Sequence, residues 1–116
     1  MSDELKMLPA RFFRSSSGNE PVREWLLALA KADRKKIGVA IGTVEYGWPI
    51  GMPTCRPMGN GLWEVRSDLP QNRIARVLFY VAEGNMILLH GFIKKTRKTP
   101  KADMDIALDR KKELEK

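Results

Sequence analysis

The sequence predicts an α+β domain in which two helices pack on a twisted, mainly antiparallel four-stranded sheet and a third helix ends the chain. Two observations support this class. Apolar residues recur at helical spacing between residues 22 and 44, and from residue 62 the period changes to two, which is typical of strands. The chain has 116 residues, enough for one hydrophobic core, so we expect a single domain over residues 1–116.

The first half predicts one short strand followed by two helices. Residues 7–14 are apolar and aromatic, as in a strand, and a Ser/Gly turn follows them. We expect Asn19 to cap the first helix and Asp33 to cap the second. Their apolar stripes are Val22, Trp25, Leu26 and Leu29, then Ile37, Ala40, Ile41 and Val44.

The second half predicts a loop, three strands and a helix. Residues 48–61 are rich in proline and glycine and are predicted to form a loop. Strands are expected at residues 62–66, 73–82 and 86–93, with a tight hairpin turn between the last two. Thr99 and Pro100 are suited to begin the terminal helix.

The charge is basic and concentrated late in the chain. The formal net charge is +7, and residues 91–101 contain five Lys or Arg and no acid. Such a segment is typical of a surface that binds a polyanion, although a merely solubilising surface has the same composition. With one cysteine and one histidine, the chain has no internal disulfide and no His/Cys zinc site, and we expect no metal or cofactor. The sequence contains neither a membrane-spanning apolar run nor a signal peptide, so a cytoplasmic location is expected.

The segment LWEVRSDLPQNRIARVLFYVAEGNMILLHGFIKKTRKTP, followed by a charged helix, resembles the RelE/ParE toxin superfamily. The closer similarity is to its HigB-like branch of phage-derived Gp49-like proteins. The resemblance implies a RelE-like fold and the toxin of a type II toxin–antitoxin module that cuts mRNA on the translating ribosome. It also implies a cognate helix-turn-helix antitoxin, similar to HigA, as partner. ParE-type relatives with the same fold instead inhibit DNA gyrase.

RNA cleavage without a metal requires a base for the 2′-hydroxyl, stabilisation of the phosphorane-like charge and an acid for the 5′-oxygen. One histidine cannot provide a histidine pair, but arginine and lysine can stabilise charge and move protons. By resemblance, Arg66 contacts RNA near the cut and Arg76 holds the scissile phosphate. Arg76 also lies within an apolar strand, where its charge needs a cleft, a carboxylate or a ligand. The functional lysine matches the Lys94-Lys95 pair, best Lys95, and a regular strand directs the two to opposite faces.

The remaining candidates have weaker support. His90 lies among leucines and is either a packed structural residue or a proton-transfer or stacking residue. Tyr80 could stack on a base, and we expect Arg73, Arg97 and Lys98 to contact the RNA backbone or to solvate the surface.

Three functions therefore remain open from the sequence. The first is a ribosome-dependent mRNA endoribonuclease that inhibits translation. The second is a ParE-like inhibitor of gyrase that leaves RNA intact. The third is a nucleic-acid-binding module without catalysis, whose affinity falls steeply with salt.

Overall fold

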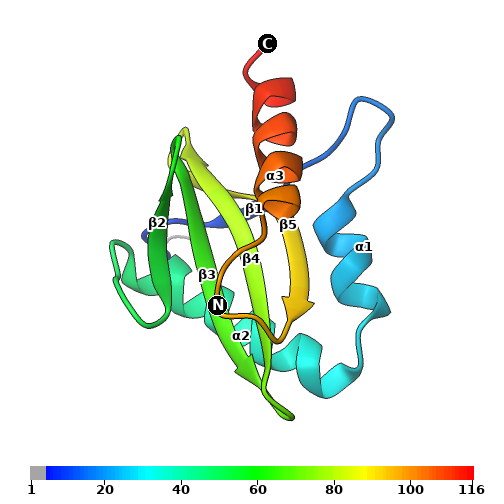
Figure 1. Cartoon of the computed structure of the whole chain (residues 1–116). Coiled ribbons are helices and arrows are strands. Elements are labelled where there is room, and N and C mark those ends of the chain that lie inside the picture. The colour runs from blue at the N-terminus through cyan, green and yellow to red at the C-terminus, as the bar shows by residue number, and fades with distance from the viewer. Residues whose placement is uncertain (1–4) are drawn as a thin grey trace.

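The computed structural model describes residues 5–116 as a five-stranded sheet with helices on both faces (Figure 1). The elements in chain order are β1 (Ala10–Phe12), α1 (Pro21–Ala28), α2 (Lys31–Gly47), β2 (Cys55–Gly59), β3 (Leu62–Leu69), β4 (Arg73–Ala82), β5 (Asn85–Lys94) and α3 (Lys101–Leu114). The α+β class, the two early helices and the terminal helix agree with the prediction. Among residues 5–116, no helix is both long and apolar enough to cross a membrane.

The prediction of a four-stranded sheet is wrong by one strand. The strand order is β1-β5-β4-β3-β2, with β1 parallel to β5 and every other neighbouring pair antiparallel. The additional strand, β2, lies in the segment predicted to be a loop. Pro57 is tolerated there because β2 is an edge strand, and a turn with positive φ at Gly59, Asn60 and Gly61 leads directly into β3.

The predicted helix caps are also wrong. The residue before α1 is Glu20 rather than Asn19, and α2 begins two residues before Asp33, which lies in its first turn. The residue before α3 is Pro100, and the hydroxyl of Thr99 donates to the carboxylate of Glu64 instead of capping the helix. In each case a tertiary contact or the local backbone takes precedence over the capping preference of the residue type.

The sheet has an apolar core on each face. One core packs α1 and α2 against strand residues such as Val65, Val77 and Phe79. The other packs α3 against Leu78, Leu89 and their neighbours. In Figure 1, α2 passes behind the strands and α3 stands on the opposite side, near β5. Strand alternation therefore decides which of the charged strand residues face α3.

Gly91 allows α1 to approach β5 closely. A Cβ atom at this position would lie 2.4 Å from Cζ3 of Trp25, a half-buried α1 residue. The glycine of the H-G-F segment is therefore required by packing, since any side chain would displace the indole ring.

Candidate functional site

Four basic side chains line one hollow of about 350 Å³ at the end of the sheet. Arg66 comes from β3, Arg73 begins β4, and Lys95 and Arg97 follow β5. Since β4 is antiparallel to both neighbours, the last residues of β3, the first residues of β4 and the last residues of β5 lie at the same end of the sheet. The topology therefore brings together cations that are up to 31 positions apart in sequence (97 − 66 = 31).

Three of these four cations are available to a ligand. Within residues 5–116, the side chains of Arg66, Lys95 and Arg97 make no hydrogen bond or ion pair, and Lys95 and Arg97 are exposed. Arg73 differs because it holds Asp33 of α2 through two contacts of 2.8 and 3.1 Å. Its hydrogen bonds lower the pKa of the Asp33 carboxyl below the ordinary value. Asp68 is the one acid among the residues that line the hollow, so its net charge is positive, which suits an anion such as a phosphate.

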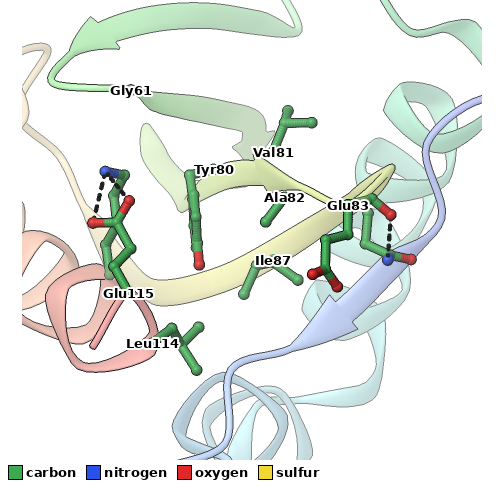
Figure 2. Close-up of a pocket in the computed structure, with 10 residues that line it drawn as sticks. Gly61, Tyr80, Val81, Ala82, Glu83, Ile87, Leu114 and Glu115 are labelled. Atoms are coloured by element: carbon green, nitrogen blue, oxygen red, sulfur yellow. Dashed lines mark hydrogen bonds and ion pairs between the residues drawn. The ribbon is translucent and has the colours of Figure 1, made fainter.

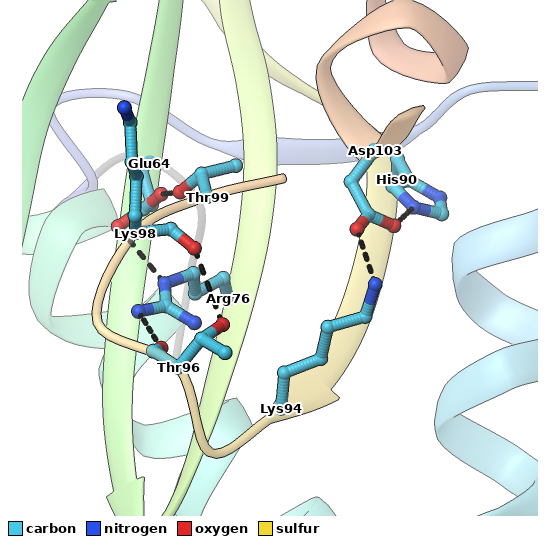
Figure 3. Close-up of polar contacts among 8 residues, drawn as sticks. All are labelled: Glu64, Arg76, His90, Lys94, Thr96, Lys98, Thr99 and Asp103. Atoms are coloured by element: carbon cyan, nitrogen blue, oxygen red, sulfur yellow. Dashed lines mark hydrogen bonds and ion pairs between the residues drawn. The ribbon is translucent and has the colours of Figure 1, made fainter. Parts of the chain in front are cut away.

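Arg76 lies next to this hollow but is fully buried. Its side chain has 0% exposed surface. Its Nη2 donates to the carbonyl oxygen of Thr96 at 2.6 Å, as Figure 3 shows, and to that of Arg97 at 2.5 Å. Its Nε is 3.6 Å from Oε1 of Glu64, a β3 residue that is also buried. The guanidinium therefore contacts only protein atoms in this arrangement.

These contacts make the basic segment after β5 part of the core. Glu64 accepts a hydrogen bond from Thr99 and lies 3.4 Å from Nε of Arg56. The Arg76–Glu64 pair therefore fixes residues 96–99, and with them the backbone of Arg97 at the edge of the hollow. Burial lowers the pKa of the Arg76 guanidinium, and the charge of Glu64 opposes that shift.

A second polar cluster joins β5 to α3 (Figure 3). Asp103 accepts from Nε2 of His90 at 2.7 Å and from Nζ of Lys94 at 2.9 Å. Arg110 donates to the carbonyl of Leu89 at 2.8 Å and lies 3.5 Å from Nδ1 of His90. Lys94 is thus held by α3, whereas Lys95 lines the basic hollow.

The environment of His90 favours the neutral imidazole. Burial lowers the pKa of His90 below 6.5, although the hydrogen bond and the charge of Asp103 oppose this change. Burial raises the pKa of Asp103, but its bonds to His90 and Lys94 outweigh that and hold it below the ordinary value. Because both ring nitrogens of His90 face protein groups, this geometry favours the structural interpretation of the residue.

Tyr80 lies at the opposite end of the molecule from the basic hollow. It is 8% exposed and lines a hollow of about 650 Å³ with the β4–β5 turn and the end of α3 (Figure 2). Lys111 lies 5.4 Å from the centre of its ring. The structure therefore does not bring Tyr80 together with Arg66, Lys95 and Arg97. The last predicted contact residue, Lys98, is exposed in the segment after β5.

Sequence reasoning missed the acidic residues that position these cations. Glu64 is the acid of the W-E-V-R segment, on the same face as Arg66 and Arg76, so alternation could have indicated a pair. Asp103 lies in the terminal helix, which the sequence predicts only as charged, and the packing of α3 on β5 places it beside His90. Within residues 5–116, no group of three or more His, Cys, Asp or Glu could hold a metal ion.

Comparison with known families identifies the class of protein. A family model described as phage derived protein Gp49-like (DUF891) matches residues 24–112, which is more than half of the chain. The protein therefore belongs to the Gp49-like family, a family of the RelE/HigB-like toxin type, as its sequence predicts. Membership supports a toxin–antitoxin role with an antitoxin partner at the level of the family. No curated protein matches the chain.

Proposed function

We propose that this protein is the toxin of a type II toxin–antitoxin module and that it cleaves mRNA on the ribosome. The observation that carries the proposal is the group of Arg66, Lys95 and Arg97, which line one hollow without protein partners. Several cations around one hollow match the closely spaced phosphates of a nucleic acid. Membership of the toxin-type family supports the same function.

In the proposed reaction, the 2′-oxygen of a ribose attacks the adjacent phosphorus and the bond to the 5′-oxygen breaks. Arg66 and Arg97 stabilise the negative charge that develops on the phosphate oxygens. Lys95 protonates the departing 5′-oxygen, while Lys94 stays bound to Asp103. A water molecule accepts the 2′-hydroxyl proton, and the products are a 2′,3′-cyclic phosphate and a free 5′-hydroxyl end. The ribosome positions the substrate for this step.

Arg76 has an indirect role in this proposal. Its two bonds to the carbonyls of Thr96 and Arg97 hold the segment that carries Arg97 and Lys98. His90 likewise acts through structure, by joining β5 to α3. Both are positioning residues, so the charges that contact RNA are those of Arg66, Lys95 and Arg97, with Lys98 nearby.

A purified translation reaction with a defined mRNA tests the proposal, with new 5′ ends mapped by primer extension. We expect cuts within the reading frame only when ribosomes are present. Arg66→Ala should slow cleavage by about 10²-fold, the usual effect of removing one donor that stabilises transition-state charge. Arg23→Ala, which removes an exposed arginine of α1 that does not line the hollow, is the matched control and should cut normally.

The other outcomes distinguish the alternatives. Equal cutting of naked RNA would remove the ribosome from the proposal and keep the nuclease. Intact mRNA in the presence of a toxic wild-type protein would refute the nuclease, and a gyrase supercoiling assay would follow. Equal rates for the Arg66 and Arg23 variants would show that the basic hollow is not the site.

A further inference from the structure

The hollow of about 650 Å³ beside Tyr80 has a polar group without a partner in its wall. Tyr80 is 8% exposed and belongs to the core that packs α3 on the sheet. Among residues 5–116, no group donates a hydrogen bond to its hydroxyl or accepts one from it. Figure 2 shows the hydroxyl pointing into the hollow, toward Ile87 and Leu114. Because a buried tyrosine usually hydrogen-bonds through its hydroxyl, this wall indicates a ligand with a polar atom.

Two carboxylates lie on opposite sides of the Tyr80 ring (Figure 2). One belongs to Glu115, which pairs with Lys111 at 3.0 Å, and the other to Glu83 in the β4–β5 turn. Within the described part of the chain, the carboxylate of Glu83 makes no hydrogen bond or ion pair. Burial is the main cause that raises the pKa of Tyr80. The charges of Glu115 and Glu83 add to this increase, and that of Lys111 opposes it. With two acids against one base, the hollow attracts a cation.

The side chain of Lys111 shows which kind of cation this hollow accepts. Its ammonium lies 5.4 Å from the centre of the Tyr80 ring. A Cβ atom at Gly61 would lie 3.3 Å from Cε of Lys111, so the glycine leaves room for the aliphatic stem. An alkyl chain that ends in an ammonium therefore already lies across the ring. Ile87 and Leu114, the latter 41% exposed, provide further apolar surface for methylene groups.

We propose that the hollow beside Tyr80 binds a linear aliphatic polyamine, a chain of methylene groups that carries several protonated amino groups. One terminal ammonium meets the carboxylate of Glu83, and the other meets that of Glu115. An inner ammonium donates to the hydroxyl oxygen of Tyr80, and the methylene groups lie on Ile87 and Leu114. The hollow shares no lining residue with the basic hollow, so this proposal does not rest on the function proposed above.

Isothermal titration calorimetry of spermidine, a linear triamine, into the full-length protein tests the site. We expect one molecule to bind per chain. Tyr80→Phe removes only the hydroxyl and should weaken binding by about threefold to tenfold, the usual effect of losing one hydrogen bond. Glu83→Gln removes one charge and should weaken it by about fivefold. The matched control is Glu24→Gln, which neutralises an exposed carboxylate of α1 outside the hollow and should bind normally.

The outcomes separate a polyamine site from a general attraction of cations. Equal spermidine affinities for the Tyr80, Glu83 and Glu24 variants would refute the site. Displacement of spermidine by an equal concentration of Mg²⁺ would show that the carboxylates attract any cation, and it would overturn the proposal. Tighter binding of a tetralysine peptide than of spermidine would assign the hollow to lysine side chains of a partner protein, which would also overturn it. Because calorimetry measures binding to the protein alone, absence of mRNA cleavage would count against the proposed reaction and not against this site.

Discussion

Replacement of Arg76 by alanine should destabilise the protein, whatever it does to activity. The side chain has no exposed surface, and its removal leaves the carbonyls of Thr96 and Arg97 without their donor. It also leaves Glu64, itself fully buried, with only Arg56 and Thr99 as partners. Breaking a buried ion pair by deleting one partner costs about 3–5 kcal/mol, since the remaining charge is no longer compensated.

Urea denaturation measures this cost directly. A loss of about 4 kcal/mol lowers the urea midpoint by about 2 M if the m-value is about 2 kcal/mol per M. The matched control is Arg73→Ala, which removes an arginine from the same strand. The Arg73–Asp33 pair is partly exposed, so its loss should shift the urea midpoint far less than the loss of Arg76 does.

A neutral replacement of the pair keeps the experiment informative if Arg76→Ala does not fold. Arg76→Met combined with Glu64→Gln removes both charges and keeps most of the volume, so it should recover much of the lost stability. Equal midpoints for the Arg76→Ala and Arg73→Ala variants would refute the structural role. A double variant less stable than Arg76→Met alone would also contradict it. A loss of toxicity in Arg76→Ala can therefore result from unfolding alone, so it must be interpreted together with the stability measurement. Replacement of Arg66 does not disturb the core and tests the basic hollow directly.

Two further predictions follow from the packing of β5. Gly91→Ala should lower the free energy of unfolding by about 1–3 kcal/mol, because its Cβ meets the ring of Trp25. Trp25→Leu should remove most of this cost, because the smaller side chain leaves room for the new Cβ atom. If Gly91→Ala lowered the urea midpoint equally with and without Trp25→Leu, the contact would be refuted. The pKa of His90 is lowered chiefly by burial, so the unfolded chain binds a proton that the folded chain resists. The contribution of His90 to the free energy of unfolding should therefore be complete above about pH 6.5 and should decrease as the pH falls below that value. The His90→Gln variant should lack this decrease. Plots of the free energy of unfolding against pH that run parallel for the two proteins would contradict the prediction.

The sequence by itself determined the helices and strands whose residues show a clear apolar periodicity or a β-forming composition. The sequence predicts a strand from Arg73 to Ala82 with the bounds that the structure has, because most of these ten residues are apolar or β-forming and leave little choice of conformation. Helical periodicity located α1 and α2, and family resemblance gave the RelE/HigB-like class that the family match confirms. The sequence also showed that the excess charge lies in the second half of the chain.

The tertiary structure determined the features that depend on contacts between residues distant in sequence. Residues 55–59 form the strand β2 because they pair with β3 through backbone hydrogen bonds, although their own residue types are typical of a loop. Lys94 and Lys95 are adjacent and of one type, yet one pairs with Asp103 and the other lines the basic hollow. Arg76 is buried because Glu64 and the segment after β5 provide its partners. The energy of a charge depends on its surroundings far more than on its neighbours in sequence, so local patterns cannot tell a buried, paired arginine from one that is free to bind RNA.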